Sequence, residues 1–370
     1  MLGLSRDTAD VAAVREAVGQ VLDPELHRTL AELAMLRAVT RSRAGRVEVE
    51  VALTTAGCPM TQRLTRDVTD AASAVPGVHD VTVTFIVMSE TERRALADRF
   101  LADRPSRGGS PASAVYAVAS GKGGVGKSSV AANLAVALAQ QGKRVGLLDA
   151  DVWGYSVPQL FGVRNSPIAM YETMLPVQAH GVSLMSLGFL VEDETPIVWR
   201  GPMLHKALTQ FVNDVHWGDL DVLLLDLPPG TGDVTLSVLE LLPEASLVVV
   251  TTPQPAARTV ASRVGVMARD SHMPIAGVVE NMSGLICANC GDHTPLFGSG
   301  GGQQLADELG VPLLGQVPLD AALREAGDEG VPVVVGAPRS ASAQALVAVS
   351  GALRPVRRSL VGRQLGLQPV

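Results

Sequence analysis

Residues 121–128 read GKGGVGKS, a glycine-rich stretch that could hold phosphate groups. The stretch fits the pattern G-x-x-x-x-G-K-[ST], with the apolar run 114–120 before it and a helical pattern after it. Glycines let the backbone wrap closely around phosphate oxygens, and the start of a helix adds positive potential. A plain glycine turn is the alternative, but this strand and helix are the context that a phosphate-binding loop requires. We therefore predict a nucleotide site formed by Gly121, Lys122, Gly123, Gly124, Val125, Gly126, Lys127, Ser128 and Ser129.

Carboxylates at the ends of two apolar runs fit the chemistry of this site. Lys127 is expected to reach the β- and γ-phosphates of ATP, and the Ser128 hydroxyl to ligate Mg²⁺. Asp226 ends one run and is expected to hold Mg²⁺ through water. Asp149 and Asp151 end another run, and the carboxyl ends of parallel strands converge on one crevice. Asp151 is the candidate for positioning the attacking water, with a helix cap as the alternative.

Lys122 is a second lysine inside the loop, where one would suffice. Its side chain is expected to project away from the cradle that its own backbone builds. It is either a solvated charge without a role or a cation that reaches the nucleotide of a second subunit, as an arginine finger does. Spacing alone leaves both alternatives open.

Cys287 and Cys290 form a C-x-x-C pair after the apolar run 275–281. This spacing lets both thiolates meet one metal or cluster. A chance pair and a redox disulfide are alternatives, but the pair does not open a helix in a thioredoxin-like context. Tetrahedral zinc would need two more ligands, of which His293 could be one. In a symmetric dimer, two such pairs supply four thiolates, enough for a bridging [4Fe–4S] cluster. A third cysteine, Cys58, is either a ligand or transfer thiol, or merely a small residue.

The rest of the chain predicts α/β architecture in two domains. We expect a helix over 8–21, strands over 46–54 and 80–88, a helix from about Met60, and one over 89–100 that opens with a capping box. Val/Leu-rich runs that alternate with helical segments predict a doubly wound, mostly parallel sheet. Those runs are 114–120, 144–150, 220–228, 245–253, 275–281 and 312–318. The expected parts are a small α/β domain (1–101), a linker (102–113), a P-loop ATPase domain (114–353) and a C-terminal tail (354–370).

Composition narrows the setting in which the protein works. At 370 residues the chain is long enough for two cores, and a net charge of −7 argues against a nucleic-acid partner. Three cysteines cannot form a disulfide framework, and the N-terminus has no apolar signal segment. We expect a cytoplasmic protein without stable membrane association.

The loop GKGGVGKSS resembles the Walker A loop of the MinD/ParA/nitrogenase-iron-protein class, in which the extra lysine acts across a dimer. Residues 114–350 resemble the Mrp/ApbC/Nbp family of P-loop iron–sulfur cluster carriers, with matching stretches such as LLDADVWGYSVP, LDLPPGTGD and VVENMSGLICANCG. Residues 8–100 look like the small domain, associated with iron–sulfur cluster assembly, that precedes this ATPase in many bacterial members. The chain departs from the family at Tyr155, where a proline is usual, and at 255–258, which read PAAR.

The resemblance implies a nucleotide-dependent homodimer in which Lys122 acts in trans. It also implies that Asn281 contacts the adenine and that Cys287 and Cys290 carry a cluster for transfer to apo-proteins. ATP, Mg²⁺ and a [4Fe–4S] cluster are the expected ligands. The alternative is a MinD/ParA-like spatial organiser that acts on membrane or nucleoid through the basic stretch 353–367, but that class has no need for the cysteine pair.

Overall fold

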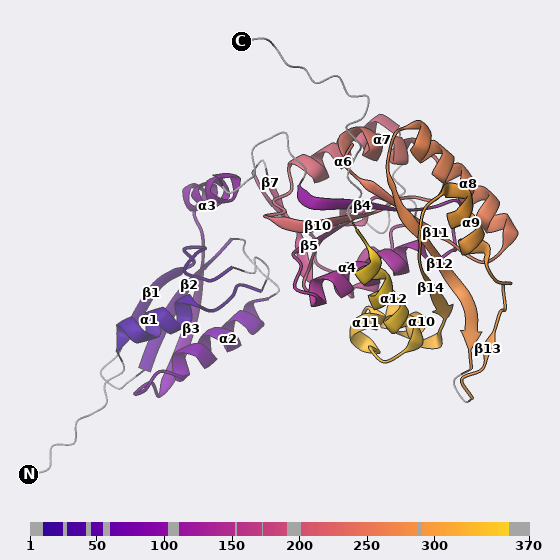
Figure 1. Ribbon diagram of the computed structural model, residues 1–370. Helices are drawn as coiled ribbons and strands as arrows, with labels where there is room; N and C mark the ends of the chain where they lie inside the picture. Colours follow the sequence, from indigo (N-terminus) through magenta and orange to yellow (C-terminus); the bar gives the residue numbers. More distant parts are fainter. Residues whose placement is uncertain are drawn as a thin grey trace, which may run out of the picture. The chain divides into compact units, whose positions relative to one another are not determined.

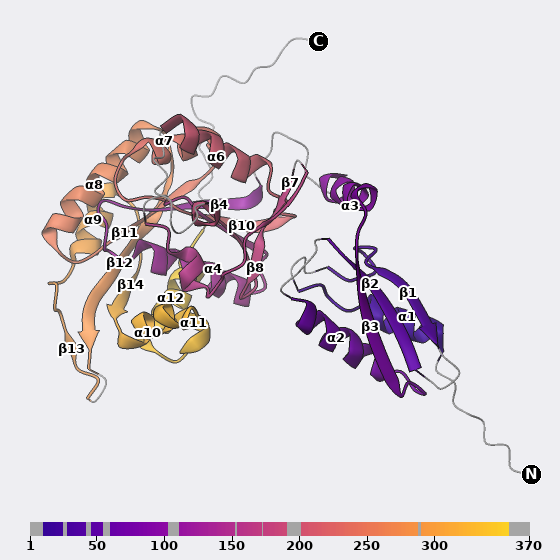
Figure 2. The ribbon, with the colours of Figure 1, turned by 180° about the vertical axis from the view of Figure 1, so that it is seen from behind.

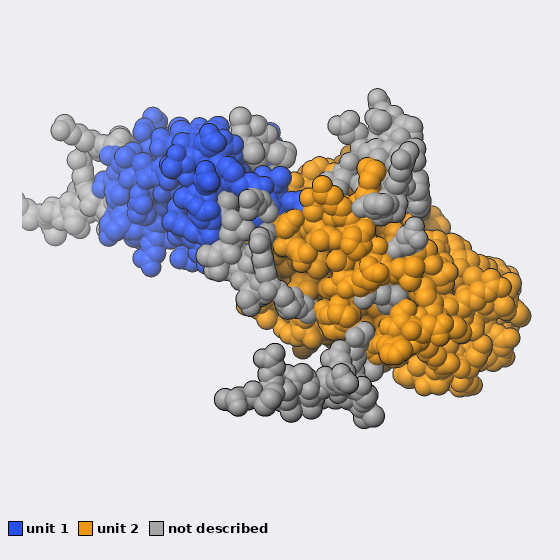
Figure 3. All heavy atoms as spheres, turned by 90° about the horizontal axis from the view of Figure 1, so that it is seen from above, with its two compact units in different colours: residues 1–104, 168–178 blue, residues 105–167, 179–370 orange. Residues whose placement is uncertain are grey.

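The computed structural model describes residues 10–24, 28–41, 46–54, 60–102, 111–151, 154–171, 173–190, 201–287 and 290–354. The chain forms two compact units, coloured separately in Figure 3. Unit 1 consists of residues 1–104 and 168–178, and unit 2 of residues 105–167 and 179–370.

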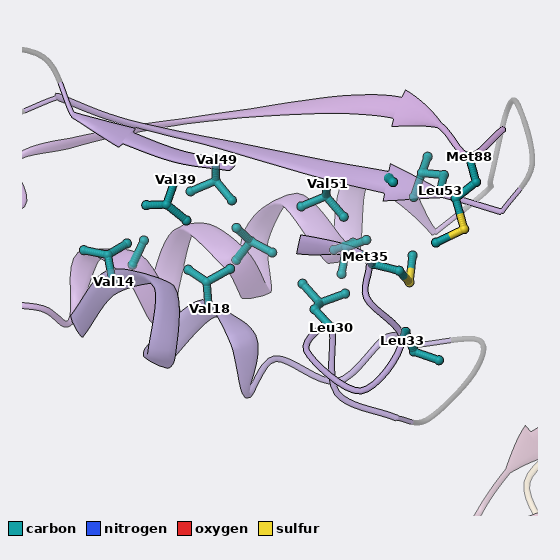
Figure 4. Close-up of a cluster of buried hydrophobic side chains, with 14 of the residues drawn as sticks. Val14, Val18, Leu30, Leu33, Met35, Val39, Val49, Val51, Leu53 and Met88 are labelled. Carbon is teal, nitrogen blue, oxygen red and sulfur yellow. The ribbon is translucent and has the colours of Figure 1, made fainter. Parts of the chain in front are cut away.

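Unit 1 is a three-stranded sheet covered by helices. Strands β1 and β2 are antiparallel and β2 and β3 are parallel, in the order β1-β2-β3. Strand β2 alternates as expected, and its Val47, Val49 and Val51 belong to one buried apolar cluster with residues of α1 and α2. Figure 4 shows Val49 and Val51 in this cluster, together with Val14 and Val18 of α1. The elements are α1 (Val11–Gly19), β1 (Leu36–Arg41), β2 (Arg46–Leu53), α2 (Thr61–Ser73), β3 (Asp80–Val87) and α3 (Glu90–Ala102). Every element expected here is present, whereas β1 was not anticipated.

Helix α3 begins with the expected capping box. The Ser89 amide donates to Glu92 Oε2 at 2.8 Å, and the Glu92 amide donates to Ser89 Oγ at 3.3 Å. These two bonds satisfy backbone donors that the first helical turn leaves without partners.

A short hairpin from later in the chain packs with unit 1. It consists of β6 (Ile168–Met170) and β7 (Thr173–Leu175), which pair antiparallel. Leu175 is buried in the same apolar cluster as the sheet, Tyr171 Oη donates to the carbonyl of Glu90 at 2.9 Å, and Arg94 lies 5.9 Å from the centre of the Tyr171 ring. The sequence predicts one domain over 114–353, whereas these contacts group residues 168–178 with unit 1.

Unit 2 is built on a nine-stranded sheet in the order β13-β12-β11-β4-β10-β5-β9-β8, with β14 paired to β12. The boundary between the units falls inside the edge strand β8, between residues 178 and 179. The pairs among β4, β5, β9, β10, β11, β12 and β14 are parallel, and β13 is antiparallel to β12. The strands are β4 (Ala112–Ser120), β5 (Val145–Asp149), β8 (Val177–Ala179), β9 (Val182–Ser186), β10 (Leu220–Asp226), β11 (Ser246–Thr251), β12 (Ile275–Ile286), β13 (His293–Thr294) and β14 (Leu313–Leu319). The predicted α/β fold with a mostly parallel sheet is confirmed.

Helices cover both faces of this sheet, which is why its central strands are continuously apolar. Figures 1 and 2 show α6, α7 and α8 over one face, and α4 with α10, α11 and α12 over the other. The helices are α4 (Lys127–Gln140), α5 (Val157–Leu160), α6 (Gly201–Asn213), α7 (Asp233–Leu241), α8 (Pro255–Asp270), α9 (Gly301–Leu309), α10 (Ala321–Glu329), α11 (Val333–Gly336) and α12 (Ala341–Ala352). Among the described residues, no helix combines the length and apolar character needed to cross a membrane.

Candidate functional site: a phosphate loop beside a cysteine hairpin

The glycine-rich loop joins the central strand β4 to helix α4, and its glycines face two different surroundings. A Cβ added to Gly121 would meet the backbone of Val260 in α8 at 2.4 Å, and one added to Gly126 would meet Asn281 Nδ2 at 2.2 Å. Gly123 and Gly124 are exposed, and an added Cβ would have no neighbour within 4 Å. The outer glycines therefore fit the loop against the protein, and the inner ones leave open the side on which phosphate would lie.

The ammonium group of Lys127 is buried among oxygen atoms. Its Nζ lies 2.5 Å from Asp226 Oδ1, 3.8 Å from Asp151 Oδ2 and 3.2 Å from Ser128 Oγ. Asp226 is the last residue of β10, and Asp151 follows β5, which pairs with β10. The structure thus brings four predicted site residues together at the carboxyl ends of neighbouring parallel strands. The Asp151 carboxylate also accepts from the amide of Gly154 at 3.0 Å, whereas the cap of α5 is Ser156.

Asp149 supports this arrangement from inside the sheet. Its carboxylate accepts from the amides of Asp151 and Val157 and from the Ser186 hydroxyl, at 3.1, 3.3 and 3.0 Å. Burial, with the nearby negative charge of Asp226, raises the pKa of Asp149 to about 7. Burial also raises the pKa of Asp226, against the opposing effect of Lys127. Asp149 therefore acts as the anchor that fixes the loop carrying Asp151, a role that its sequence position did not reveal.

The oxygen atoms around Lys127 fit a magnesium ion. Ser128 supplies a hydroxyl, and Asp226 and Asp151 supply carboxylates, the hard ligands that Mg²⁺ takes in phosphoryl-transfer sites. Asp226 Oδ2 is buried and has no hydrogen-bond partner among the residues that the structure describes. Such an acceptor costs about 1–3 kcal/mol when it stays unpaired, so it suits an ion or its water. Bound Mg²⁺ would neutralise charge on the phosphates.

The second lysine of the loop has a different partner. Lys122 is half-buried, and its Nζ lies 3.3 Å from Oε1 of Gln254, the residue that precedes α8. Gln254 lies directly before the PAAR segment that departs from the family pattern, and its contact with Lys122 could not be read from the sequence. The lysine is thus held by a neutral amide, while Lys127 is held by carboxylates.

Asn281 is buried in strand β12 beside the phosphate loop. Its Nδ2 donates to the carbonyl of Val125 at 2.8 Å, which fixes the orientation of the amide because a carbonyl can only accept. Asn281 Oδ1 is buried and has no hydrogen-bond partner among the described residues. It is therefore presented as an acceptor, which suits the exocyclic amino group of adenine.

The cysteine pair lies at the far end of the same strand. Strand β12 ends at Ile286, and Cys287 and Cys290 lie in the turn that leads to β13. The Gly291 amide donates to the carbonyl of Cys287, and the Cys287 amide donates to the carbonyl of Asp292, both at 2.9 Å. Cys287 is half-buried and Cys290 is exposed. Figures 1 and 2 both show this end of β12 projecting with β13 from the rest of unit 2.

The remaining candidate residues lie only partly among the residues that the structure describes. Within the described ranges, no group of three or more His, Cys, Asp and Glu residues is placed to hold a metal, and the His293 ring instead lies where a Cβ on Gly284 would be. Tyr155, which replaces the usual proline, packs its ring on Gly188. Cys58 and residues 355–370 of the basic tail lie outside the described residues.

The central parallel sheet, the glycine loop and the paired lysine and carboxylates define the chain as a P-loop NTPase. Residues 112–354 match the model of the family described as NUBPL iron-transfer P-loop NTPase, and the chain belongs to this family. Residues 11–85 match a second family model, described as iron–sulfur cluster assembly protein. The resemblance stated from the sequence is confirmed.

Curated relatives and a solved structure support the assignment. The iron–sulfur cluster carrier protein of Mycobacterium tuberculosis is 48% identical over 376 residues, covering 99% of this chain and 98% of the relative. The iron–sulfur cluster carrier protein of Synechocystis is 45% identical, covering 91% of this chain and 95% of the relative. A nucleotide-binding protein from Archaeoglobus fulgidus, solved in complex with ADP, is 39% identical with a TM-score of 0.53, covering 60% of this chain and 87% of that chain.

Proposed function

We propose that this protein is an ATP-hydrolysing carrier that binds a [4Fe–4S] cluster at Cys287 and Cys290 and passes it to apo-proteins. The single observation that carries the proposal is the continuity of strand β12. The strand holds Asn281 against the phosphate loop and, one residue past its end, holds the first cysteine. Nucleotide and cluster would thus bind to one element of structure. The names of the relatives and of both matched families support the same cargo.

In the proposed hydrolysis, residues of one subunit bind and orient the triphosphate. Backbone amides of the loop and Lys127 hold the phosphates, and the phosphates would take over this lysine from Asp226. Ser128 and Asp226 would hold Mg²⁺, Asp151 would orient the attacking water, and Asn281 Oδ1 would accept from the adenine amino group.

The proposal requires two copies of the chain for two separate reasons. Each copy supplies two thiolates in one exposed turn, and a [4Fe–4S] cluster takes four. Lys122 lies away from Lys127, on Gln254, so its charge is available to the triphosphate of a facing subunit. A homodimer would satisfy both needs at once, with Lys122 acting in trans.

Anaerobic reconstitution with iron and sulfide tests the proposal. Wild type should bind about one [4Fe–4S] cluster per dimer, show its visible absorbance and transfer it to an apo-acceptor. The double variant Cys287→Ala/Cys290→Ala should lose both loading and transfer. Cys58→Ser is the matched control, because it removes a thiol from outside the hairpin. Equal loading of the double variant and wild type refutes the assigned site, and a loaded protein that stays monomeric with ATP refutes the bridging.

A further inference from the structure

The side chain of one buried residue, Glu280, joins the two ends of the segment 280–302, which carries the cysteines. Glu280 is fully buried, its Oε2 accepts from the Gly302 amide at 2.5 Å, and its Oε1 accepts from Gln316 Nε2 at 2.6 Å. The segment starts at Glu280, where the pairing of β12 with β11 ends, passes through Cys287 and Cys290, and returns at Gly302, so this hydrogen bond joins its two ends. A buried carboxyl group is costly to leave without hydrogen-bond partners, so the fold favours keeping this bond closed.

The outgoing end of the segment contacts the nucleotide site. Pairing of β12 with β11 ends at Glu280, and the next residue, Asn281, donates to the phosphate loop. Met282 follows with φ +57°, a left-handed conformation that is strained for a residue other than glycine. The pairing with β14 shifts register between Asn281 and Leu285. An irregular, kinked stretch of β12 thus separates the nucleotide contact from the cysteine turn.

The returning end explains the run of three glycines at 300–302. Gly300 is the left-handed cap of α9, with φ +77°. A Cβ on Gly301 would lie 2.3 Å from the carbonyl oxygen of Pro253, and one on Gly302 would lie 2.5 Å from Cβ of Glu280. Pro253 precedes Gln254, the partner of Lys122. The return of the segment is therefore packed on the same loop that holds the second lysine.

We propose that Glu280 is a positioning residue that transmits the nucleotide state to the Cys287–Cys290 turn. The inference rests on the proposed function of these cysteines. Nucleotide acts at Asn281 on the outgoing end and beside Gln254 on the returning end. Because Glu280 ties the two ends together, a displacement at Asn281 also moves the returning end at Gly302. Without this tie, the displacement would reach the cysteines only across the kink at Met282.

Thiol reactivity reports this coupling without any cluster. In a Cys58→Ser background, only Cys287 and Cys290 remain to react with a thiol reagent such as DTNB. We expect Mg-ATP to change the rate of modification about fivefold or more in the full-length protein, the lower end of ordinary site-to-site coupling. Glu280→Ala should bring the ratio of rates with and without ATP to one while the protein still binds ATP.

Glu280→Gln is the matched control, because it can keep the closure. Its Oε1 can accept from Gly302, and its amide nitrogen can donate to Gln316 once the Gln316 amide reverses. This variant should restore the nucleotide-dependent ratio. Gln316→Ala, which removes one of the two partners and leaves β12 unchanged, should lower the ratio and serves if Glu280→Ala does not fold.

Three results would overturn the inference: a wild type whose thiol reactivity ignores ATP, a Glu280→Ala variant that keeps the wild-type ratio, or a Glu280→Gln variant as uncoupled as Glu280→Ala. These results are distinct from failure of the proposed function. A protein that takes up no cluster but shows ATP-dependent thiol reactivity would refute cluster carriage and leave the coupling intact.

Discussion

Gly126→Ala is expected to damage both the fold and the nucleotide site, because the added methyl group has no space. Gly126 has φ +79°, and a left-handed conformation costs alanine about 1–2 kcal/mol. The new Cβ would also lie 2.2 Å from Asn281 Nδ2, so the Asn281 amide must leave the carbonyl of Val125. Leaving buried hydrogen-bonding groups without partners costs a further 1–3 kcal/mol or so. The two effects together amount to roughly 2–5 kcal/mol.

Thermal unfolding and nucleotide titration measure the two consequences separately. For a domain of this size, that loss lowers the unfolding midpoint of unit 2 by roughly 5–15 °C. ATP affinity should fall as well, since Asn281 is displaced from the position in which we propose that it contacts adenine. The measurement is calorimetry of the full-length protein, scanned without nucleotide and then titrated with Mg-ATP.

Gly123→Ala is the matched control within the same loop. Gly123 does not have a positive φ, and the added methyl group meets no atom within 4 Å. The midpoint should therefore equal that of wild type. ATP affinity should still fall about tenfold or more, because the methyl group occupies the side of the loop that faces the phosphates. Equal destabilisation by Gly126→Ala and Gly123→Ala, or wild-type ATP affinity in Gly123→Ala, would refute the conclusion that Gly126 packs against the protein while Gly123 faces the phosphates.

Two further predictions follow from the buried charges. Lys127→Ala should abolish ATP binding and destabilise unit 2, since it leaves Asp226 buried without its cation. Lys122→Ala should bind ATP normally but stop hydrolysis. Calorimetric titration measures the binding and phosphate release measures the hydrolysis; loss of ATP binding in Lys122→Ala would contradict the action of Lys122 in trans. Because the folded-state pKa of Asp149 is raised from 3.8 to about 7, its contribution to stability is complete below pH 4 and is lost as pH rises through about 7. Urea unfolding should show that the free energy of unfolding of the wild type falls between pH 5 and pH 8, and that the fall is smaller in Asp149→Asn. An identical fall in wild type and Asp149→Asn would disprove the raised pKa of Asp149.

Local sequence patterns predicted the phosphate loop and the strands around it, but not the contacts between residues far apart in the sequence. The phosphate loop and the strands that end at Asp149 and Asp226 could be read from the sequence, because each signal lies within a few residues. The short hairpin at 168–175 gave no such signal, since strands of three residues show no clear alternation and Leu175 packs into the core of unit 1, whose other buried residues lie before residue 105 in the sequence.

The contacts of the coupling residues were hidden for a related reason. Lys122 and Gln254 lie 132 residues apart, and Glu280 and Gly302 lie 22 apart. Their pairing depends on which strands become neighbours in the sheet. The three glycines at 300–302 are visible in the sequence, but their physical cause, the lack of space beside Pro253 and Glu280, needs coordinates.

The two lysines of the loop differ in how firmly they are held, and this difference supports their separate roles. Lys127 is buried with the charged partner Asp226, so removing the lysine without a substitute leaves an uncompensated charge. Lys122 is half-buried on the neutral amide of Gln254, a hydrogen bond whose net contribution is about 0.5–1.5 kcal/mol. A triphosphate presented by a second subunit offers several negative charges in place of that one amide oxygen. Release of Lys122 from Gln254 therefore costs less than release of Lys127 from Asp226. It occurs beside Pro253, where the returning end of the cysteine segment is packed. In the proposed mechanism, engagement of the second subunit and movement of the cysteine turn consequently begin at the same loop.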